Sequence, residues 1–321
     1  MDNEVRRIAV VGSGYMGGGI AQVLALGGRD VALADVDAAT AAAARERLVE
    51  QAGAFEAAEL FPAGARDRVA ARLTAAASIE DAVADADYIT EAVPEVPAIK
   101  AEVLARISAA ARPDAVIGSN TSAIPIGDLA VSVTHPERFL GVHWMNPAPF
   151  VPSVELILAA GTDPAVVGPI EELLRAAGKV PARVSDSPGF VANRLQFALF
   201  KEAVRMVEEG LATPEQIDLV VANAFGFRLA LFGPFAIADM AGLDVYDRSY
   251  ASLETEYGER LASPRMLREL VESGRLGTKS GGGFLDIPAD RLAELVAYRD
   301  RAYARLSQLR AELGTAPGLG S

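Results

Sequence analysis

The sequence of 321 residues contains no cysteine. Without thiols the protein can form no disulfide, use no thiolate nucleophile and bind no metal through sulfur. Histidine is almost as scarce, with two copies, and tryptophan occurs once. Any histidine chemistry must therefore depend on His135 or His143, and we expect no metal site.

Basic residues are also fewer than acidic residues. The chain carries 30 Lys and Arg against 43 Asp and Glu, which gives a net charge of −13. Such a balance argues against nucleic acid or an anionic membrane as a general partner. Only four of the basic residues are lysines, at positions Lys100, Lys179, Lys201 and Lys279.

Long apolar runs are also missing. The most apolar stretches are interrupted by Asp35, Asp37 or glycines well short of the length of a membrane span. The polar start, MDNEVRR, leads straight into an apolar strand and lacks the pattern of a secretory signal. We therefore expect a cytoplasmic protein that does not associate with membranes.

Short apolar runs alternate with helical stretches over the first 186 residues of a chain that is too long for one core. This alternation predicts an α/β domain with a Rossmann-type doubly wound, mostly parallel sheet. Residues 40–77, rich in Ala, Arg and Glu, predict a helical hairpin inserted after the second strand. The expected strands cover residues 7–11, 31–35, 88–93, 115–119, 139–143, 153–158 and 180–184.

Strand signals nearly vanish after residue 186, so the sequence predicts an α/β domain over 1–186 and an all-helical C-terminal domain over 187–321. Ser187 as N-cap and Pro188 at the first helical position predict where the first helix of the second domain begins. The expected helices cover residues 190–209, 214–224, 234–256, 264–274 and 288–313.

A glycine pattern, G-x-G-x-x-G, joins the first strand to the first helix. Gly12 permits a tight turn, Gly14 lets the backbone approach a pyrophosphate, and Gly17 packs the helix against the strand. Asp35 follows eighteen residues after Gly17, at the spacing of a carboxylate that meets the adenosine ribose and would repel a 2′-phosphate. NAD is favoured over NADP, and a glycine-rich turn without a ligand is the alternative. The fingerprint comprises Gly12, Ser13, Gly14, Tyr15, Met16 and Gly17.

The two histidines differ in context. His135 precedes Pro136 in a loop and is expected to be solvated, whereas His143 ends the run FLGVH at the sheet edge where α/β proteins bind ligands. Glu155 lies inside the apolar run SVELIL, where an unpaired carboxylate is unfavourable. A pair of the two would hold the imidazole in one tautomer, as a general base requires. A purely structural pair within the sheet is the alternative.

Four polar residues, SNTS at 119–122, follow another strand at this same edge. A turn cap needs only one such side chain. We therefore expect at least one of Ser119, Asn120, Thr121 and Ser122 to face the site.

Taken together, the motifs resemble the L-3-hydroxyacyl-CoA dehydrogenase family over nearly the whole chain. They occur in the family's order: GSGYMGGGIA, AVPE with Lys100, SNTS, GVHWMNP, VEL, DSPGFVANR, GPF with AGLD, and GTKSGGGF. The resemblance implies that His143 is the general base and Glu155 its orienting partner. It implies that Ser122 and Asn193 bond the reacting oxygen. It also places four residues near NAD: Glu95, Lys100, Asn146 and Lys279.

The resemblance implies reversible oxidation of an L-3-hydroxyacyl substrate, similar to a 3-hydroxyacyl-CoA of fatty acid metabolism, to its 3-keto form. One departure concerns the carrier: residues 36–99 contain no lysine, and their arginines include Arg45, Arg47, Arg66, Arg68 and Arg72. Members of the family use lysine and serine in this region for the CoA phosphates. Other segments resemble the L-gulonate 3-dehydrogenase and lambda-crystallin branch. A free 3-hydroxy acid, a polyketide-type ketoreductase substrate or a non-catalytic crystallin-like role are therefore alternatives.

The segment GFVANRLQF places polar residues at the start of an apolar helix. We expect Asn193 to face the cleft while Val191, Leu195 and Ala198 face the core. A buried amide bonded to the interdomain linker is the alternative for Asn193, and the sequence does not assign a role to Arg194. The apolar helix at 214–224 and the GPF segment at 233–235, together with the resemblance, predict a homodimer.

Overall fold

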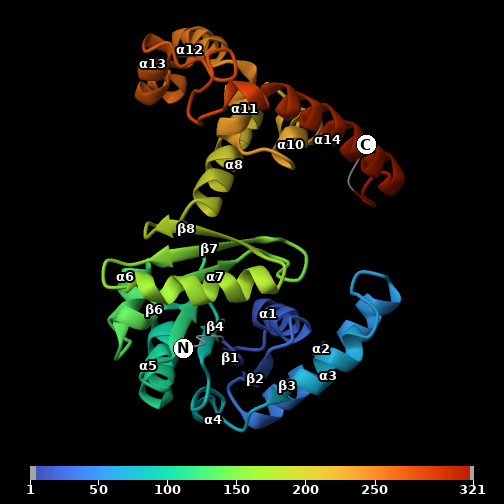
Figure 1. Cartoon of the computed structure of the whole chain (residues 1–321), viewed down its shortest axis with the longest axis vertical. Helices are drawn as coiled ribbons and strands as arrows, with labels where there is room; N and C mark the ends of the chain where they lie inside the picture. The colour runs from blue at the N-terminus through green and yellow to red at the C-terminus, as the bar shows by residue number, and fades with distance from the viewer. Residues whose placement is uncertain (1–4, 319–321) are drawn as a thin grey trace. The chain divides into compact units, whose positions relative to one another are not determined.

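The computed structural model describes residues 5–318 and divides the chain into two compact units, Met1–Leu199 and Phe200–Ser321. The division falls inside the long helix α8 (Ala192–Glu208), which is labelled in Figure 1. Part of the polar start MDNEVRR, residues 1–4, lies outside the described residues. The domain boundary predicted at 186/187 stays a prediction.

The first unit contains an eight-stranded sheet in the order β3-β2-β1-β4-β5-β6-β7-β8 within the described residues (Figure 1). Neighbouring strands are parallel except for β6 and β7, which pair antiparallel. The predicted mostly parallel, doubly wound sheet is confirmed. The strands are β1 (Arg7–Val11), β2 (Asp30–Ala34), β3 (Leu73–Ala75), β4 (Tyr88–Glu91), β5 (Val116–Ser119), β6 (Phe139–Trp144), β7 (Ser153–Leu158) and β8 (Val180–Ser185).

Helices cover both faces of the sheet because successive strand residues point to opposite sides. In β1, Ile8 and Val10 pack in one core with α1, α2, α3 and α7. Ala9 and Val11 pack in a second core with α4, α5 and α6. The helices are α1 (Tyr15–Leu26), α2 (Ala38–Ala57), α3 (Ala65–Arg72), α4 (Ile79–Val83), α5 (Pro97–Ala110), α6 (Ile126–Ala130) and α7 (Val167–Ala176). Short 3₁₀ turns occur at Pro136–Arg138 and Pro164–Val166.

The predicted hairpin over 40–77 is present as α2 and α3, but its last residues are not helical. Leu73, Thr74 and Ala75 form β3, which pairs with β2 at the sheet edge. Three residues are too few to show an alternating pattern, and Leu73 is buried because it continues the sheet. The prediction of a wholly helical insertion was wrong at this point.

The second unit is helical, as predicted. Its buried apolar core is small, with Ala238, Leu243 and Leu267 at its centre. The helix predicted over 234–256 is split at Gly242, whose φ of 102° a side chain rarely adopts. Its helices are α9 (Pro214–Asn223), α10 (Phe225–Leu229), α11 (Pro234–Ala241), α12 (Leu243–Tyr257), α13 (Arg265–Glu272) and α14 (Leu292–Leu313), with 3₁₀ turns at Gly258–Leu261 and Ala289–Arg291.

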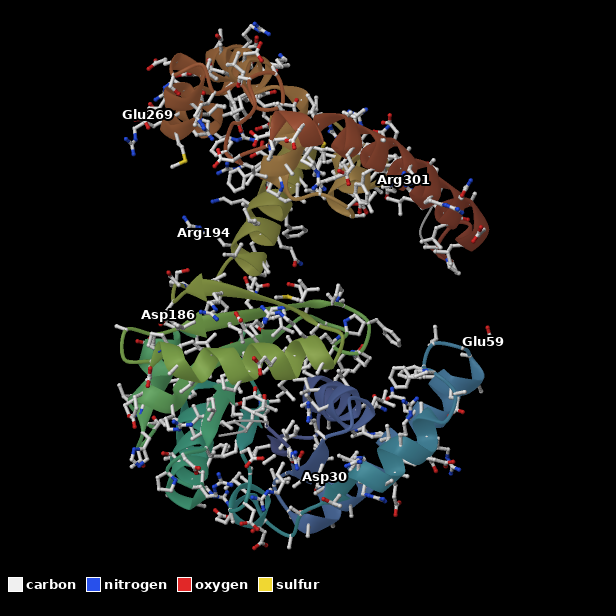
Figure 2. All side chains as sticks on the ribbon, viewed as in Figure 1. Asp30, Glu59, Asp186, Arg194, Glu269 and Arg301 are labelled. Carbon is white, nitrogen blue, oxygen red and sulfur yellow. The ribbon has the colours of Figure 1, made fainter. Side chains whose placement is uncertain are left out.

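The start of α8 differs from the prediction. Residues 187–191 form a turn, in which Phe190 N–H donates to the Ser187 carbonyl, and the helix begins at Ala192 rather than at Pro188. Val191 and Leu195 are 48% and 58% exposed, and Ala198 is also exposed. The expectation that these three residues face a core was therefore wrong. Arg194 is exposed too, and Figure 2 shows its side chain pointing away from α8.

None of the helices in residues 5–318 combines the length and the apolarity needed to cross a bilayer.

Candidate active site

The glycine fingerprint forms the turn between β1 and α1, and two of its glycines are fixed by close contacts. A Cβ on Gly12, whose φ is 100°, would lie 2.6 Å from the Ala92 carbonyl oxygen. A Cβ on Gly17 would lie 1.8 Å from the Gly12 carbonyl oxygen. Neither position has room for a side chain, so both glycines are needed to bring α1 against the strands.

Gly14 is different because its side-chain position is open and faces no other group of the protein. A Cβ there would meet no heavy atom within 4 Å. The helix N-terminus beside it has no side-chain cap, and its first turn contains no acidic residue. The residues fit the pyrophosphate of a dinucleotide, since free N–H groups and a positive helix end favour an anion. Tyr15 at the start of α1 is exposed, whereas Met16 packs against the adjoining core.

Asp35 directly follows β2 and lies beside the fingerprint. Its Oδ2 accepts hydrogen bonds from Ser13 N–H at 2.7 Å and Ser13 Oγ at 2.5 Å, and its Oδ1 accepts from Val36 N–H at 2.8 Å. Burial alone would raise the pKa of Asp35, but these bonds outweigh burial and hold the pKa below its usual value. An ionised carboxylate therefore lies next to Ser13, which fits a site that prefers NAD to NADP.

His143 and Glu155 are direct neighbours across the antiparallel β6–β7 pair. His143 Nδ1 and Glu155 Oε2 are 2.9 Å apart, and both side chains are buried. The predicted pairing of the two residues thus follows from the sheet register. Phe190, which is buried and has a positive φ of 48°, places its ring 5.6 Å from the imidazole.

The second oxygen of Glu155 holds the start of α8. Oε1 accepts hydrogen bonds from Val191 N–H at 3.0 Å and Ala192 N–H at 2.9 Å. Burial raises the pKa of Glu155, but the bonds from His143, Ala192 and Val191 outweigh it and lower the pKa. An ionised Glu155 only accepts, so Nδ1 of His143 carries the proton of this bond, and in the neutral imidazole the lone pair is then on Nε2. Within residues 5–318 nothing hydrogen-bonds Nε2.

Ser122 and Asn193 are brought together by the backbone of the turn after β5. Asn193 Nδ2 donates to the Ser122 carbonyl at 2.9 Å, and Ser122 N–H donates to Glu95 Oε1 at 2.8 Å. The partner of the amide is thus this turn rather than the interdomain linker. Both ends of the Ser122 backbone are fixed, while its Oγ has no hydrogen bond within the described part of the chain.

A charge network that runs from the buried Glu91 and Lys100 to the exposed Glu95 supports that turn. Lys100 is fully buried, and its ammonium lies 2.8 Å from Glu91 Oε1, 3.2 Å from the Val93 carbonyl and 3.3 Å from Glu95 Oε2. Glu95 in turn accepts from Thr121 Oγ1, at 2.5 Å, and from two backbone N–H groups of the turn. Burial raises the pKa of Glu95, but these bonds outweigh burial and lower it. Lys100, predicted to approach NAD, contacts the two glutamates in this structure.

Glu91, which was not predicted as a site residue, is fully buried at the end of β4. It accepts from Lys100, from Val93 N–H at 2.8 Å and from Ser119 Oγ at 2.6 Å. The sequence does indicate Glu91, because this acidic residue interrupts an apolar strand just as Glu155 does. Asn120 was also unassigned: its Oδ1 accepts from Trp144 N–H at 2.9 Å and so joins this turn to β6.

The remaining predicted cofactor residues are placed as follows. Asn146 is exposed in the loop after β6. Lys279 belongs to the second unit, where its ammonium pairs with Asp244 at 2.6 Å. His135 pairs with Glu137 at 3.2 Å, in an exposed position. Among the described residues no group of three or more His, Asp and Glu side chains could hold a metal ion.

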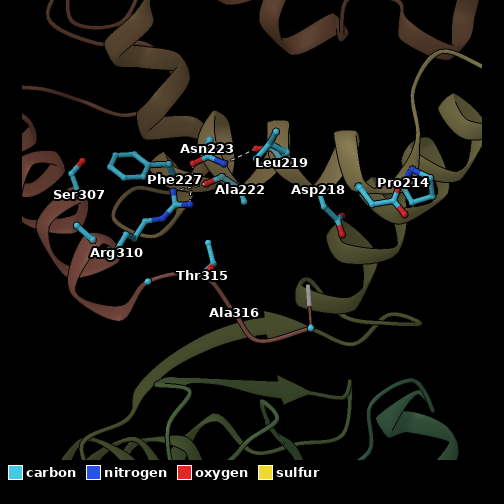
Figure 3. A pocket seen from close by; sticks show the side chains of 14 residues that line it. Pro214, Asp218, Leu219, Ala222, Asn223, Phe227, Ser307, Arg310, Thr315 and Ala316 are labelled. Atoms are coloured by element: carbon cyan, nitrogen blue, oxygen red, sulfur yellow. Dashed lines mark hydrogen bonds between the residues drawn. The ribbon is translucent and has the colours of Figure 1, made fainter. Parts of the chain in front are cut away.

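A cleft of about 1250 Å³ lies in the second unit between α9, α10 and the end of α14 (Figure 3). Arg310 crosses it, donating to the Ala222 carbonyl at 3.0 Å and to Asn223 Oδ1 at 2.9 Å. None of the predicted catalytic residues lines the cleft. The volume of this cleft is therefore no evidence for a catalytic role.

Two family models cover most of the chain. The NAD binding domain of 3-hydroxyacyl-CoA dehydrogenase matches residues 7–187, and the C-terminal domain of 3-hydroxyacyl-CoA dehydrogenase matches residues 189–287. The chain belongs to the 3-hydroxyacyl-CoA dehydrogenase family. The resemblance found in its motifs is confirmed, as are the Rossmann-type fold, NAD as the cofactor and an oxidoreductase that acts on CH–OH groups.

Individual relatives carry two kinds of name. The chain is 38% identical over 299 residues to 5-formyl-3-hydroxy-2-methylpyridine 4-carboxylate 5-dehydrogenase of Mesorhizobium japonicum, covering 92% of this chain and 96% of that protein. It is 37% identical over 287 residues to 3-hydroxybutyryl-CoA dehydrogenase of Mycobacterium tuberculosis, covering 88% and 99%. Among solved structures, a 3-hydroxyacyl-CoA dehydrogenase from Archaeoglobus fulgidus has a TM-score of 0.76 at 31% identity, covering 94% and 99%.

The open space at Gly14 leads to a first prediction. We expect Gly14→Ala to fold with an unchanged melting temperature, because the new methyl group meets nothing in the protein. The same methyl would occupy the approach of the pyrophosphate, so the Kd for NADH should rise roughly tenfold or more. Fluorescence titration with NADH measures this, with Gly161→Ala as the control because a Cβ on Gly161 also meets nothing within 4 Å. Unchanged affinity in Gly14→Ala would place the pyrophosphate elsewhere.

The double use of Glu155 leads to a second prediction. In Glu155→Gln the amide oxygen would accept from Val191 and Ala192, so its NH₂ group would donate to His143 Nδ1. The proton would then reside on Nε2, and turnover should fall by roughly 10³–10⁴-fold, as when a triad carboxylate is replaced by its amide. Glu155→Ala should lose both the tautomer and the anchor of α8, and should also lower the melting temperature. Full activity in Glu155→Gln would contradict the tautomer assignment.

Proposed function

We propose that this protein oxidises an L-3-hydroxyacyl substrate to its 3-keto form, and catalyses the reverse reaction, with His143 as the general base. The observation that carries the proposal is the 2.9 Å contact between His143 Nδ1 and Glu155, which leaves Nε2 to take the hydroxyl proton. Glu155 stabilises the imidazolium that results. NAD, when bound, supplies the acceptor for the hydride that leaves the carbinol carbon.

Two side chains support the reacting oxygen in this proposal. Ser122 offers its Oγ, which no described residue engages, and Asn193 keeps one N–H and its amide oxygen after donating to the Ser122 carbonyl. Hydrogen bonds from such groups hold the oxygen for proton transfer and stabilise its developing charge. Because Glu155 and the Ser122 turn both fasten the start of α8, these groups share one rigid support.

The predicted cofactor contacts remain part of the proposal. Gly12 to Gly17 would cradle the pyrophosphate and Asp35 the adenosine ribose. Glu95 and Asn146 would complete the site on the first unit, with Lys100 acting through Glu95 because its ammonium is engaged by the two glutamates. The expectation that Lys279 approaches NAD stays a prediction. We also propose that the protein acts in the cytoplasm, in keeping with a chain that contains no cysteine.

A free 3-hydroxy acid is the second candidate substrate, and the arginines of α2 and α3 favour it. Arg45 donates to the Leu73 and Ala70 carbonyls, and Arg68 donates to those of Gly64 and Ala63. Arg47 and Arg72 are engaged as well, by the Ser13 carbonyl and by Asp30. Among the described residues, Arg66 is the one arginine of this hairpin whose guanidinium has no hydrogen bond, so the hairpin offers few unengaged cations to CoA phosphates. The pyridine carboxylate named for the Mesorhizobium relative is likewise a free acid.

The third prediction tests both the base and the carrier. Wild-type protein should oxidise NADH with acetoacetyl-CoA or with simple 3-keto acids, and the ratio of kcat/KM values distinguishes the carriers. His143→Gln should abolish turnover with every active substrate, because it removes the proton acceptor, and should leave NADH binding close to wild type. The assignment of the base fails if this variant keeps most of the wild-type rate. Ketones typical of polyketide intermediates belong in the same panel.

We also propose a homodimer formed through the second unit. Helices α9, α10 and α14 contain no buried residue in the part of the chain that the structure describes. Leu219 and Val220 on α9 are 54% and 62% exposed. An apolar surface of this kind is typical of a protein interface.

The fourth prediction concerns this interface. The wild type should sediment as a dimer at micromolar concentration, and Val220→Glu should shift it to a monomer, because a charge would be buried in the interface. Val131→Glu is the matched control, since Val131 is 85% exposed in the first unit. A wild-type monomer would refute the proposal.

A further inference from the structure

Lys179 is a buried lysine that the proposed chemistry does not use. It directly precedes β8 and is only 5% exposed. Among the described residues, Lys100 and Lys279 pair with carboxylates, and Lys179 does not. A buried cation without an anion is unfavourable unless strong dipoles replace its hydration shell. Burial accordingly lowers the pKa of Lys179.

Three backbone carbonyls take the place of the missing anion. The ammonium donates to the Ala148 carbonyl at 2.6 Å, to that of Pro149 at 3.3 Å and to that of Val151 at 2.9 Å. It also lies 5.6 Å from the centre of the Trp144 ring. An ammonium has three N–H donors, so this set of acceptors accounts for all of them.

The three carbonyls belong to one short loop, residues 145–152, which connects β6 to β7. Carbonyl oxygens that converge on a point repel each other unless a donor lies between them. Lys179 supplies that donor from outside the loop. The next residue, Val180, donates its N–H to the Pro152 carbonyl at 2.8 Å, so the loop is fastened to the start of β8 by two consecutive residues.

The position of this loop bears on the cofactor. Asn146 is exposed in it, two residues before the first carbonyl that Lys179 binds. The loop rests on the fingerprint helix: a Cβ on Gly19 of α1 would lie 3.0 Å from Pro149 Cδ and 3.3 Å from Ala148 Cβ. Phe150 packs on Phe55 of α2, with ring centres 5.3 Å apart. The loop is therefore held between β8 and the helices that follow β1 and β2.

We propose that Lys179 is a positioning residue for the cofactor: its ammonium gathers the carbonyls of residues 148–151 and so fixes Asn146 beside the fingerprint. The inference rests on the proposed function only in the use of Asn146 as a contact for NAD. His143 and Glu155 do not depend on Lys179 for their pairing, because the β6–β7 register aligns them. Loss of the ammonium should therefore affect cofactor binding far more than the proton transfer.

The fifth prediction follows from this separation. Lys179→Met keeps the length and the apolar stem but leaves three carbonyls without a donor. We expect the Kd for NADH to rise roughly tenfold, while kcat at saturating cofactor changes by less than about threefold. Lys201→Met is the matched control, because Lys201 is an exposed lysine on α8. Binding is measured by NADH fluorescence without an acyl substrate, so the result does not depend on which substrate the enzyme uses.

A chemical rescue separates charge from packing. Since the chain has no cysteine, Lys179→Cys introduces a unique thiol that can be alkylated in the unfolded protein before refolding. Aminoethylation restores an ammonium at the length of lysine, whereas propylation places a methyl group there. We expect the aminoethyl adduct to recover wild-type NADH affinity and the propyl adduct to remain weak. Wild-type protein taken through the same cycle controls for refolding. If Lys179→Met does not fold, the comparison of the aminoethyl and propyl adducts still tests whether the ammonium supports NADH binding.

Trp144 provides a direct readout, because it is the single tryptophan and its ring lies beside the ammonium. Its emission should shift in the propyl adduct and return in the aminoethyl adduct. The inference is overturned if Lys179→Met binds NADH within twofold of wild type, or if both adducts bind it equally well. A protein that binds NADH normally yet reduces no 3-keto substrate would instead refute the proposed function and leave the test of Lys179 intact.

Discussion

The rest of the site depends on the hydrogen bonds that the buried carboxylate of Glu155 accepts. One oxygen fixes the imidazole of His143, and the other accepts two backbone N–H groups at the start of α8. A single buried group thus orients the proposed base and fixes the start of α8, the helix that carries Asn193. Glu155 can bond His143 because β6 and β7 run antiparallel within an otherwise parallel sheet, and their register places the two residues opposite each other.

Other charged side chains fix the backbone of the two loops that follow β5 and β6. Glu91, Lys100 and Glu95 act as a chain of ion pairs that ends on the N–H groups of the turn carrying Ser122. Lys179 does the equivalent for the loop after β6, with carbonyls in place of carboxylates. In both cases a lysine is placed where its donors are fully used, so that neighbouring polar groups remain in one arrangement.

Much of this could be predicted from the sequence because local patterns determine it. The fingerprint, Asp35 and the strand runs depend on a few adjacent residues, and Glu155 stood out as an acid inside an apolar strand. The three-residue strand β3 and the turn before Ala192 could not be predicted, because tertiary pairing and a positive φ at Phe190 decide them. The exposed apolar face of α8 was missed because helical periodicity shows that a face is apolar, not what covers it. Glu91 could have been predicted from the same pattern as Glu155, an acidic residue within an apolar strand.

The bond between Asp35 and Ser13 has a consequence for how the protein distinguishes its cofactors. In this structure the carboxylate already accepts from the Ser13 hydroxyl and N–H. A ribose hydroxyl that binds there exchanges one donor for another, so the net gain in affinity is small. A 2′-phosphate can make no such exchange and meets only repulsion. In the proposed site Asp35 would therefore act mainly by repelling the 2′-phosphate of NADPH, so its contribution should be visible in the ratio of NADH to NADPH binding rather than in the affinity for either.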